Sequence, residues 1–296
     1  MNLHQSSIAI TGATGFLGGF LVRKLLARGA KVVAVVRNPS KASELSALGA
    51  EVRRADLGEP EALSAAFHGC DAVISNAAVV SFSEPRKTHA TNVEGTKNVF
   101  GAIATQGIKR AIAISSASAY RASPFVRTEQ SRLRAGGALN PLSAYGSSKA
   151  ESERLAWQLS REHGVCLTTF RPCGISGPRD PLLMGALAKL GKLPFAPLPV
   201  FTEIGVVHAE DVAEAVALAL EKPQVACGKA YNLQGVSISL WRMVEAYRRA
   251  GGSAPRWLLP VPFPFLLRYD DRLARHDLGW RPRDIDAVCQ DALRGV

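Results

Sequence analysis

A tyrosine and a lysine four residues apart offer the clearest chemistry in the chain. They are Tyr145 and Lys149, within the segment YGSSK, and residues at this spacing lie on one face of a helix. A tyrosine with a pKa near 10 is a poor base at neutral pH, but a neighbouring ammonium stabilises its phenolate and lowers that pKa. The pair therefore predicts proton transfer at a substrate oxygen. By spacing alone, it is also typical of a helix surface.

Serines end an apolar run shortly before this pair. The segment RAIAISSASAY predicts a strand over 110–116 that ends in Ser115 and Ser116, with Ser118 just beyond. Ligands of open parallel sheets bind at the carboxyl ends of the strands, so a hydroxyl here could hold a carbonyl oxygen and stabilise charge developing on it. Ser115 and Ser118 could instead be loop hydroxyls or line a pocket.

Glycines interrupt the first expected strand–helix junction, in AITGATGFLGG (9–19). Gly12, Gly15 and Gly18 have the spacing of a tight turn that lets the backbone approach a pyrophosphate and directs helix N-terminal amides at its charge. The alternative is a glycine-rich turn that serves close packing. The position of these glycines between an expected strand and an expected helix favours the phosphate site.

The surrounding sequence predicts the elements that would position these residues. Apolar runs alternate with segments of helical spacing, which indicates a parallel sheet covered on both faces. The expected strands are 7–12, 31–37, 51–57, 71–78, 110–116 and 165–172, and the longest expected helices are 88–106 and 143–163. The predicted fold class is α/β, a Rossmann-type doubly wound parallel sheet with a smaller, discontinuous C-terminal lobe.

The pattern changes beyond Pro172, where proline and glycine become frequent. One further helix and one further strand are expected in VVHAEDVAEAVALALEK and KAYNLQG. We therefore expect a dinucleotide-binding domain of residues 1–172, to which 205–235 returns, and a substrate-binding lobe of 173–204 and 236–296.

Composition limits the possible partners. The net charge of +11 suits an anionic ligand, but the charge is spread without a long basic run, so we expect no nucleic-acid partner. The opening MNLHQSS has neither a basic region nor an apolar core, so we expect no secretion signal, and no uninterrupted apolar stretch reaches transmembrane length. The cysteines are odd in number and form no CxxC pair, so we expect reduced thiols, no metal site and a cytoplasmic location; they are Cys70, Cys166, Cys173, Cys227 and Cys289.

Five motifs in order carry a resemblance to a known family. They are TGATGFLG (11–18), TNVEGTKNV (91–99), YGSSK (145–149), RPCGISGPRD (171–180) and VVHAEDVAEAV (206–216). The chain resembles the extended branch of the short-chain dehydrogenase/reductase superfamily, the NAD-dependent epimerase/dehydratase family, up to about residue 235. A fainter match, DLGWRPR (277–283), is similar to the family's closing segment.

The resemblance implies a nicotinamide dinucleotide and assigns the residues that would bind it. The expected contacts are Gly12, Thr14, Gly15, Phe16, Leu17, Gly18, Arg37, Ser40, Lys41, Asp56, Leu57, Asn76, Ala77, Ala78, Tyr145, Lys149, Pro172, Cys173, Gly174 and Ile175. An acidic residue ending the second strand would favour NAD, but Arg37 stands there. With Ser40 and Lys41 it could pair with a 2′-phosphate, so we expect NADP(H) rather than NAD(H). A solvated arginine at a strand end is the alternative.

The resemblance also implies catalytic roles. Ser116 would hold the substrate oxygen, Tyr145 would transfer the proton, and Lys149 would tune Tyr145 and hold the nicotinamide ribose. Asn92 matches a family asparagine that supports the lysine, although a helix-surface asparagine is equally consistent with the pattern. Val79, Val80, Ser118 and Gly174 are expected to contact substrate. His208 is expected to anchor a junction rather than to catalyse, and Cys173 to be a small residue lining a pocket.

The substrate class follows from what the family's branches require. Sugar-nucleotide epimerases carry an Arg-Asp pair where this chain has Ile204 and Gly205, and dehydratases need an acidic residue where Ala117 and Ser118 stand. The apolar segments 193–201 and 257–267 suit a hydrophobic ligand, or else form lobe core or a surface that touches a membrane or partner.

These features predict an NADP(H)-dependent oxidoreductase of a hydrophobic ketone, aldehyde or alcohol, closest in character to steroid dehydrogenase and dihydroflavonol reductase-like members. The alternatives are a sugar-nucleotide epimerase or dehydratase with tightly held NAD, and a non-catalytic dinucleotide sensor. The resemblance further implies a homodimer through the helices near 88–106 and 143–163.

Overall fold

The structure is a computed structural model that describes residues 1–79, 84–135, 141–180, 182–199, 201–261 and 267–294. The chain divides into two compact units. The first consists of Met1–Arg121, Arg132–Arg171 and Ala213–Tyr231, and the second of Ala122–Ser131, Pro172–Val212 and Asn232–Val296. The roles expected for two such domains stay a prediction, as do their expected boundaries.

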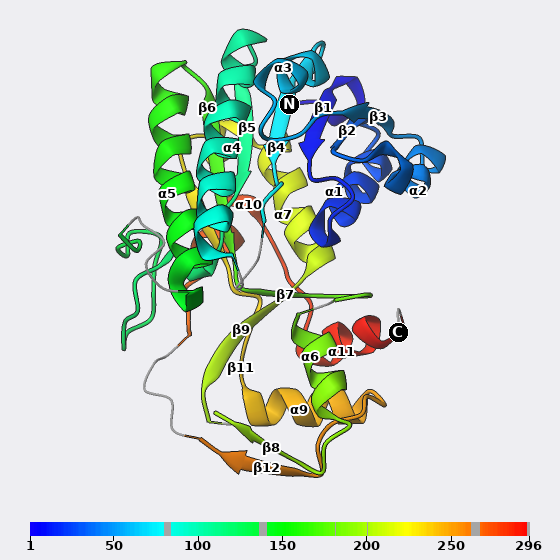
Figure 1. Cartoon of the computed structure of the whole chain (residues 1–296), viewed down its shortest axis with the longest axis vertical. Helices are drawn as coiled ribbons and strands as arrows, with labels where there is room; N and C mark the ends of the chain where they lie inside the picture. The colour runs from blue at the N-terminus through cyan, green and yellow to red at the C-terminus, as the bar shows by residue number, and fades with distance from the viewer. Residues whose placement is uncertain (80–83, 136–140, 181, 200, 262–266, 295–296) are drawn as a thin grey trace. The chain divides into compact units, whose positions relative to one another are not determined.

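A seven-stranded sheet forms the centre of the first unit, in the order β10-β6-β5-β4-β1-β2-β3 (Figure 1). Its strands are β1 (Ser7–Thr11), β2 (Lys31–Val36), β3 (Glu51–Arg54), β4 (Ala72–Ser75), β5 (Arg110–Ile114), β6 (Cys166–Pro172) and β10 (Ala230–Leu233). The neighbouring strands from β3 across to β6 pair in parallel. Successive residues such as Ile8, Ala9 and Ile10 are all buried because both faces of the sheet are covered. The α/β fold class expected from the sequence is confirmed.

Helices cover the two faces of this sheet (Figure 1). On one face, Phe67, Phe100 and Ala156 belong to a single apolar cluster with the strands, contributed by three different helices. On the other face, Lys24 Nζ of α1 lies 3.2 Å from Glu214 Oε2 of α7. The helices of this unit are α1 (Phe16–Ala27), α2 (Ser43–Ala47), α3 (Pro60–Phe67), α4 (Pro85–Thr105), α5 (Pro141–Glu162), most of α7 (Ala209–Glu221), and α8 (Pro223–Ala226). The homodimer expected through α4 and α5 stays a prediction.

The second unit has its own small sheets and apolar core. A three-stranded sheet runs β11-β9-β7 and a two-stranded sheet runs β12-β8. Met184, Met243, Tyr247 and Val288 are buried together in the core. The elements are β7 (Gly174–Ser176), α6 (Leu183–Leu190), β8 (Phe195–Leu198), β9 (Glu203–His208), β11 (Val236–Ser239), α9 (Leu240–Arg249), β12 (Trp257–Pro260), α10 (Arg272–Leu278) and α11 (Ile285–Leu293).

Within the ranges that the structure describes, none of the helices is both long enough and apolar enough to cross a lipid bilayer.

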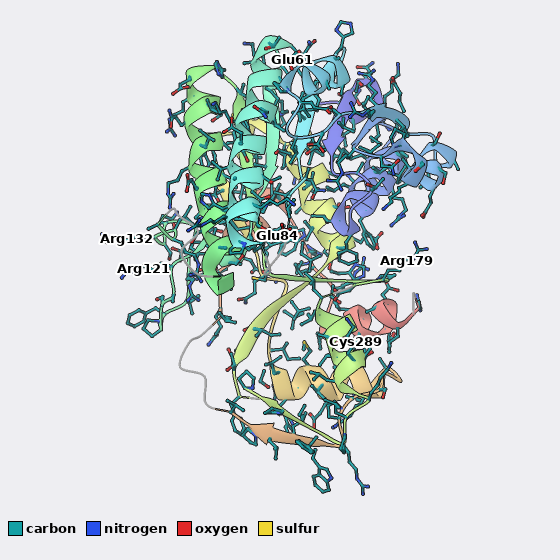
Figure 2. The ribbon with its side chains drawn as sticks, viewed as in Figure 1. Glu61, Glu84, Arg121, Arg132, Arg179 and Cys289 are labelled. Atoms are coloured by element: carbon teal, nitrogen blue, oxygen red, sulfur yellow. A yellow bond between two sulfur atoms is a disulfide. The ribbon has the colours of Figure 1, made fainter. Side chains whose placement is uncertain are left out.

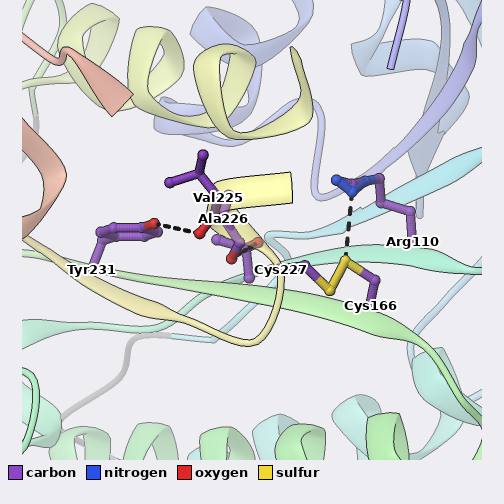
Figure 3. Close-up of a disulfide and its surroundings, with 7 residues drawn as sticks. Arg110, Cys166, Val225, Ala226, Cys227 and Tyr231 are labelled. Carbon is purple, nitrogen blue, oxygen red and sulfur yellow. Dashed lines mark hydrogen bonds between the residues drawn. A yellow bond between two sulfur atoms is a disulfide. The ribbon is translucent and has the colours of Figure 1, made fainter. Parts of the chain in front are cut away.

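The cysteines correct one expectation. Cys166 at the start of β6 and Cys227 after α8 form a disulfide, with their Cα atoms 5.3 Å apart (Figure 3). The expectation of five reduced thiols is wrong for this pair, because the fold brings together two residues that are 61 positions apart in sequence. Cys289, labelled on α11 in Figure 2, is a free thiol in the apolar core of the second unit, and burial raises its pKa to about 11.

Candidate active site

In the glycine turn between β1 and α1, two glycines have no room for a side chain and a third has nearly enough room for one. Gly12 has a φ of +66°, and a Cβ there would lie 2.8 Å from the Ala77 Cα; a Cβ on Gly18 would lie 2.2 Å from the Gly12 carbonyl oxygen. Both glycines are therefore required by packing. Gly15 is the N-cap residue of α1, where a Cβ would meet only the Gly12 oxygen, at 3.2 Å.

The N-terminus of α1 fits a phosphate. Gly15 places no side chain over the first turn, and no side-chain hydrogen bond caps the helix within the described residues. The first amides of a helix lack partners inside it and favour an anion. The packing explanation thus accounts for Gly12 and Gly18, while the uncapped amides beyond Gly15 fit a dinucleotide pyrophosphate. Thr14 is exposed next to this turn, Phe16 is half-buried, and Leu17 is buried.

Thr11 fixes the neighbouring loop, a role that the sequence did not predict. Its hydroxyl oxygen accepts hydrogen bonds from the Asn76 and Ala77 backbone N–H groups at 3.0 and 3.1 Å. The Asn76 side chain donates to the Gly12 carbonyl oxygen at 3.3 Å. These bonds join the loop after β1 to the loop after β4. The residues expected to contact the pyrophosphate and the ribose, Ala78 included, therefore lie in two neighbouring loops at the same edge of the sheet.

The residues expected at the adenosine end gather beyond β2 and β3. Arg37 follows β2 with 81% of its side chain exposed, and its Nε lies 3.9 Å from Asp56 Oδ2. Ser40 and Lys41 lie on the next short turn, where the Ser40 hydroxyl donates to Asn38 Oδ1 at 2.8 Å. Leu57 instead packs against α4, since a Cβ on Gly95 would lie 2.9 Å from its Cδ1.

The Tyr145 phenol lies close enough to the Ser116 side chain for Ser116 to act on its pKa. Ser116 Oγ lies 2.6 Å from Ser118 Oγ and accepts the Ser118 backbone N–H at 3.1 Å. Burial raises the pKa of Tyr145 to about 12, against the opposing effect of Ser116. The phenol of the protein alone is therefore protonated at neutral pH, and a lowered pKa beside the charged lysine and an oxidised nicotinamide stays a prediction.

Lys149 lies buried on the same helix, α5. Its Nζ donates to the Ile114 carbonyl oxygen at the end of β5, at 2.8 Å. Burial lowers the pKa of Lys149 to about 8, while Glu153 acts to raise it. The structure thus brings Ser116, Tyr145 and Lys149 to the carboxyl end of β5.

Asn92 clamps two segments of the first unit. Its side-chain oxygen accepts the Val79 backbone N–H at 2.8 Å, and its amide nitrogen donates to the Val79 carbonyl and to Ser148 Oγ, both at 3.0 Å. Ser148, which the sequence analysis missed, in turn donates to the Tyr145 carbonyl oxygen at 2.8 Å. Asn92 is thereby linked to Ser148, the neighbour of Lys149 on α5, and its support of the lysine stays a prediction. Val80 lies outside the described residues.

The residues expected at the nicotinamide end belong to the second unit. They are Pro172, Cys173, Gly174 and Ile175, and their part in binding stays a prediction. Burial raises the pKa of the Cys173 thiol well above its usual range, with Asp271 adding to the effect. Such a thiol is a weak nucleophile at neutral pH, consistent with a small residue that lines a wall.

His208, at the end of β9 in the second unit, lies in a cluster organised by an arginine. His208, Glu210 and Asp291 are close enough to share a cation. Arg283 occupies this position: it donates to Glu210 Oε2 at 2.8 Å, to Asp291 Oδ2 at 3.2 Å and to His208 Nδ1 at 3.1 Å. Burial and Arg283 lower the pKa of His208 to about 4, so the imidazole is neutral.

Comparison with known proteins identifies the family of this chain. The model of the NAD dependent epimerase/dehydratase family matches residues 8–233. The chain belongs to this family. Tetraketide alpha-pyrone reductase 2 of Arabidopsis thaliana is 31% identical over 246 residues, which cover 74% of this chain and 75% of that protein. Cinnamoyl-CoA reductase 1 of Arabidopsis thaliana is 31% identical over 232 residues, covering 73% and 67%.

Among solved structures, UDP-glucose-4-epimerase from Stenotrophomonas maltophila with bound NAD has a TM-score of 0.85 at 22% identity, covering 98% of each chain. At this identity, the likeness concerns the fold. As a member of the NAD dependent epimerase/dehydratase family, the chain is an enzyme of the extended short-chain dehydrogenase/reductase type, an oxidoreductase that uses NAD or NADP.

Proposed function

We propose that this enzyme uses NADP(H) to reduce a hydrophobic ketone or aldehyde, or to oxidise the corresponding alcohol. The bound nicotinamide supplies or accepts the hydride. Ser116 donates a hydrogen bond to the substrate oxygen, and Tyr145 gives that oxygen its proton during reduction and takes it back during oxidation. Lys149 holds a positive charge beside Tyr145, which favours the phenolate that forms when the proton leaves.

The observation that carries the proposal is that Ser116, Tyr145 and the buried Lys149 gather at the carboxyl end of β5, where Lys149 Nζ donates to the Ile114 carbonyl oxygen at 2.8 Å. An oxygen that contacts both hydroxyls would receive a proton from Tyr145 while Ser116 stabilises its developing charge. Because burial keeps the phenol protonated in the free protein, the site is ready to act as the acid in reduction.

The NADP preference is proposed from Arg37. Its exposed guanidinium stands at the carboxyl end of β2, and Ser40 and Lys41 add a hydroxyl and a cation on the next turn. These groups match a 2′-phosphate, which a planar guanidinium binds through two charge-assisted hydrogen bonds. Arg37 therefore favours the phosphorylated cofactor over NAD.

The substrate class is proposed from the second unit and from the relatives. Ile204 packs against an apolar core, and a Cβ on Gly205 would lie 2.7 Å from Cys173 Sγ, so this place offers no cation to a nucleotide diphosphate. On the β12–β8 sheet, the paired residues Phe195 and Trp257 are 54% and 63% exposed. These features, and relatives named as reductases, favour a lipophilic carbonyl compound over a sugar nucleotide.

A labelling experiment tests this function. The enzyme is incubated with NADPH carrying deuterium on C4 and a panel of lipophilic ketones and aldehydes, and the alcohols are analysed by mass spectrometry. We expect deuterium on the former carbonyl carbon, with NADPH preferred over NADH. Purification with tightly held NAD, together with stabilisation by a UDP- or GDP-sugar and no labelled alcohol, would instead support an epimerase.

A further inference from the structure

A buried ion pair lies one helical turn along α5 from Lys149. The Glu153 carboxylate, in a residue that is 2% exposed, accepts hydrogen bonds from Arg171 Nε at 3.0 and 3.1 Å and a further one from Nη2. Arg171, on β6, also donates to the Tyr120 hydroxyl oxygen at 2.6 Å. Burial acts to lower the pKa of Arg171, but its hydrogen bonds with Glu153 hold it above the usual value. The guanidinium therefore stays charged and holds the carboxylate in one place.

A small cavity in the first unit connects this ion pair with Lys149. Its volume is about 20 Å³, and among the described residues that line it, Lys149 and Glu153 are the charged ones. Ser115 also lines it, and its buried hydroxyl has no hydrogen-bond partner within the described part of the chain. A cavity of this size can hold one water molecule. The carboxylate therefore acts on the ammonium through its charge, and a single water that Ser115 also contacts could bridge the two.

We propose that Glu153 is a positioning residue: its carboxylate, held by Arg171, keeps the Lys149 ammonium charged and directed at the carboxyl end of β5. The effect on turnover rests on the proposed function. The effect on the charge of Lys149 does not.

The surroundings of Lys149 single out Glu153 as its source of negative charge. The titratable groups that face it on α5 are Tyr145, which is neutral at pH 7, and Glu153. Arg171, on β6, bonds to Glu153 and to Tyr120, which lies at the end of the turn after β5. The cavity residues from α4 and β4 are uncharged. Burial already brings the pKa of Lys149 down to about 8. Removing the opposing carboxylate would lower it further, so the lysine would be largely neutral at pH 7.5.

The test measures the charge of Lys149 directly. The ¹³Cε resonance of labelled Lys149, assigned by its loss in Lys149→Met, is titrated by NMR in the parent, in Glu153→Gln and in Glu153→Gln/Arg171→Met. The double variant is needed because a buried arginine without its partner is strongly destabilising, whereas replacing both charges is tolerated better. Glu151→Gln is the matched control, since Glu151 lies on α5 but its Oε2 lies 2.9 Å from His89 Nε2.

We expect the titration midpoint to move to lower pH by about one pH unit in whichever Glu153 variants fold, and to stay unchanged in Glu151→Gln. The alkaline limb of kcat/KM for carbonyl reduction should move by the same amount. A midpoint that stays at the parent value in the double variant would overturn the proposal. If the midpoint moves but no carbonyl compound is reduced by the parent, the proposed function fails while the role of Glu153 in charging Lys149 stands.

Discussion

The Lys149 ammonium donates a hydrogen bond to the Ile114 carbonyl oxygen, with a distance of 2.8 Å between the two atoms. This bond joins helix α5 to the last residue of β5, directly before Ser115 and Ser116. The same side chain that would tune Tyr145 thus fixes Tyr145 against the edge of the sheet. Lys149 would therefore both hold α5 at the end of β5 and supply the positive charge beside Tyr145.

Replacing Arg37 should separate the two cofactors. Arg37→Glu removes the cation proposed for the 2′-phosphate and places a carboxylate there, so the Kd for NADPH should rise by about tenfold or more. The Kd for NADH should be unchanged or lower. Fluorescence titration with both cofactors measures this, and Lys31→Glu, a charge reversal at the exposed start of the same strand, is the control. Equal losses for both cofactors would refute the preference for NADP.

The glycines of the first turn should separate folding from binding. Gly18→Ala forces a methyl group to within 2.2 Å of the Gly12 carbonyl, so it should lower the free energy of unfolding by roughly 1–3 kcal/mol. Gly15→Ala meets only one atom, at 3.2 Å, and should fold nearly as well as the parent but bind either dinucleotide weakly. Denaturant unfolding and cofactor titration test the pair. Unimpaired binding by Gly15→Ala would argue against a pyrophosphate at this turn.

Asn92 should prove to be a structural clamp that also affects activity. Asn92→Ala leaves the Val79 backbone without its partners, so we expect a loss of about 1–3 kcal/mol in unfolding free energy and a lower kcat. Ser148→Ala removes one of these links and should cost less. Urea unfolding together with steady-state kinetics compares them. An Asn92→Ala protein of parental stability and activity would contradict the clamp.

Reduction should fail at alkaline pH because Lys149 loses its charge. Its pKa of about 8 lies below the ordinary lysine value of 10.5, so kcat/KM should fall about tenfold per pH unit above pH 8. The same shift has a consequence for stability. Between about pH 8 and 10.5 the unfolded chain holds a proton on this lysine that the folded chain does not, so this group raises the unfolding free energy as pH rises. An alkaline limb that persists in Lys149→Met would assign it to another group.

Much of the first unit could be predicted because its signals are local. Buried parallel strands require continuous apolar runs, and the glycine turn marks the start of α1, so the expected elements agree with the observed ones to within a few residues. The strand expected to reach Ser116 ends at Ile114 instead. There the Ser116 hydroxyl caps a short turn by accepting the Ser118 N–H. Five ordered motifs also indicated the family.

The features that were missed depend on contacts between distant segments. β8 and β12 are short and rich in proline, and each becomes a strand by pairing with the other, as Phe195 does with Trp257. The Cys166–Cys227 disulfide and the Arg171–Glu153 ion pair arise in the same way. Nothing in the local pattern around any of these residues specifies its partner. The raised pKa of Tyr145 likewise follows from burial, which spacing alone does not reveal.

The most direct test of the account compares the turnover of Tyr145→Phe with that of Tyr231→Phe. The Tyr231 hydroxyl donates to the Val225 carbonyl oxygen of α8 at 3.3 Å. We predict that Tyr145→Phe lowers kcat/KM for carbonyl reduction by about 10²–10⁴-fold with the Kd for NADPH unchanged, because only the proton donor is lost. Tyr231→Phe should keep parental activity. A Tyr145→Phe enzyme that reduces the carbonyl at the parental rate would contradict the assignment of Tyr145 as the proton donor.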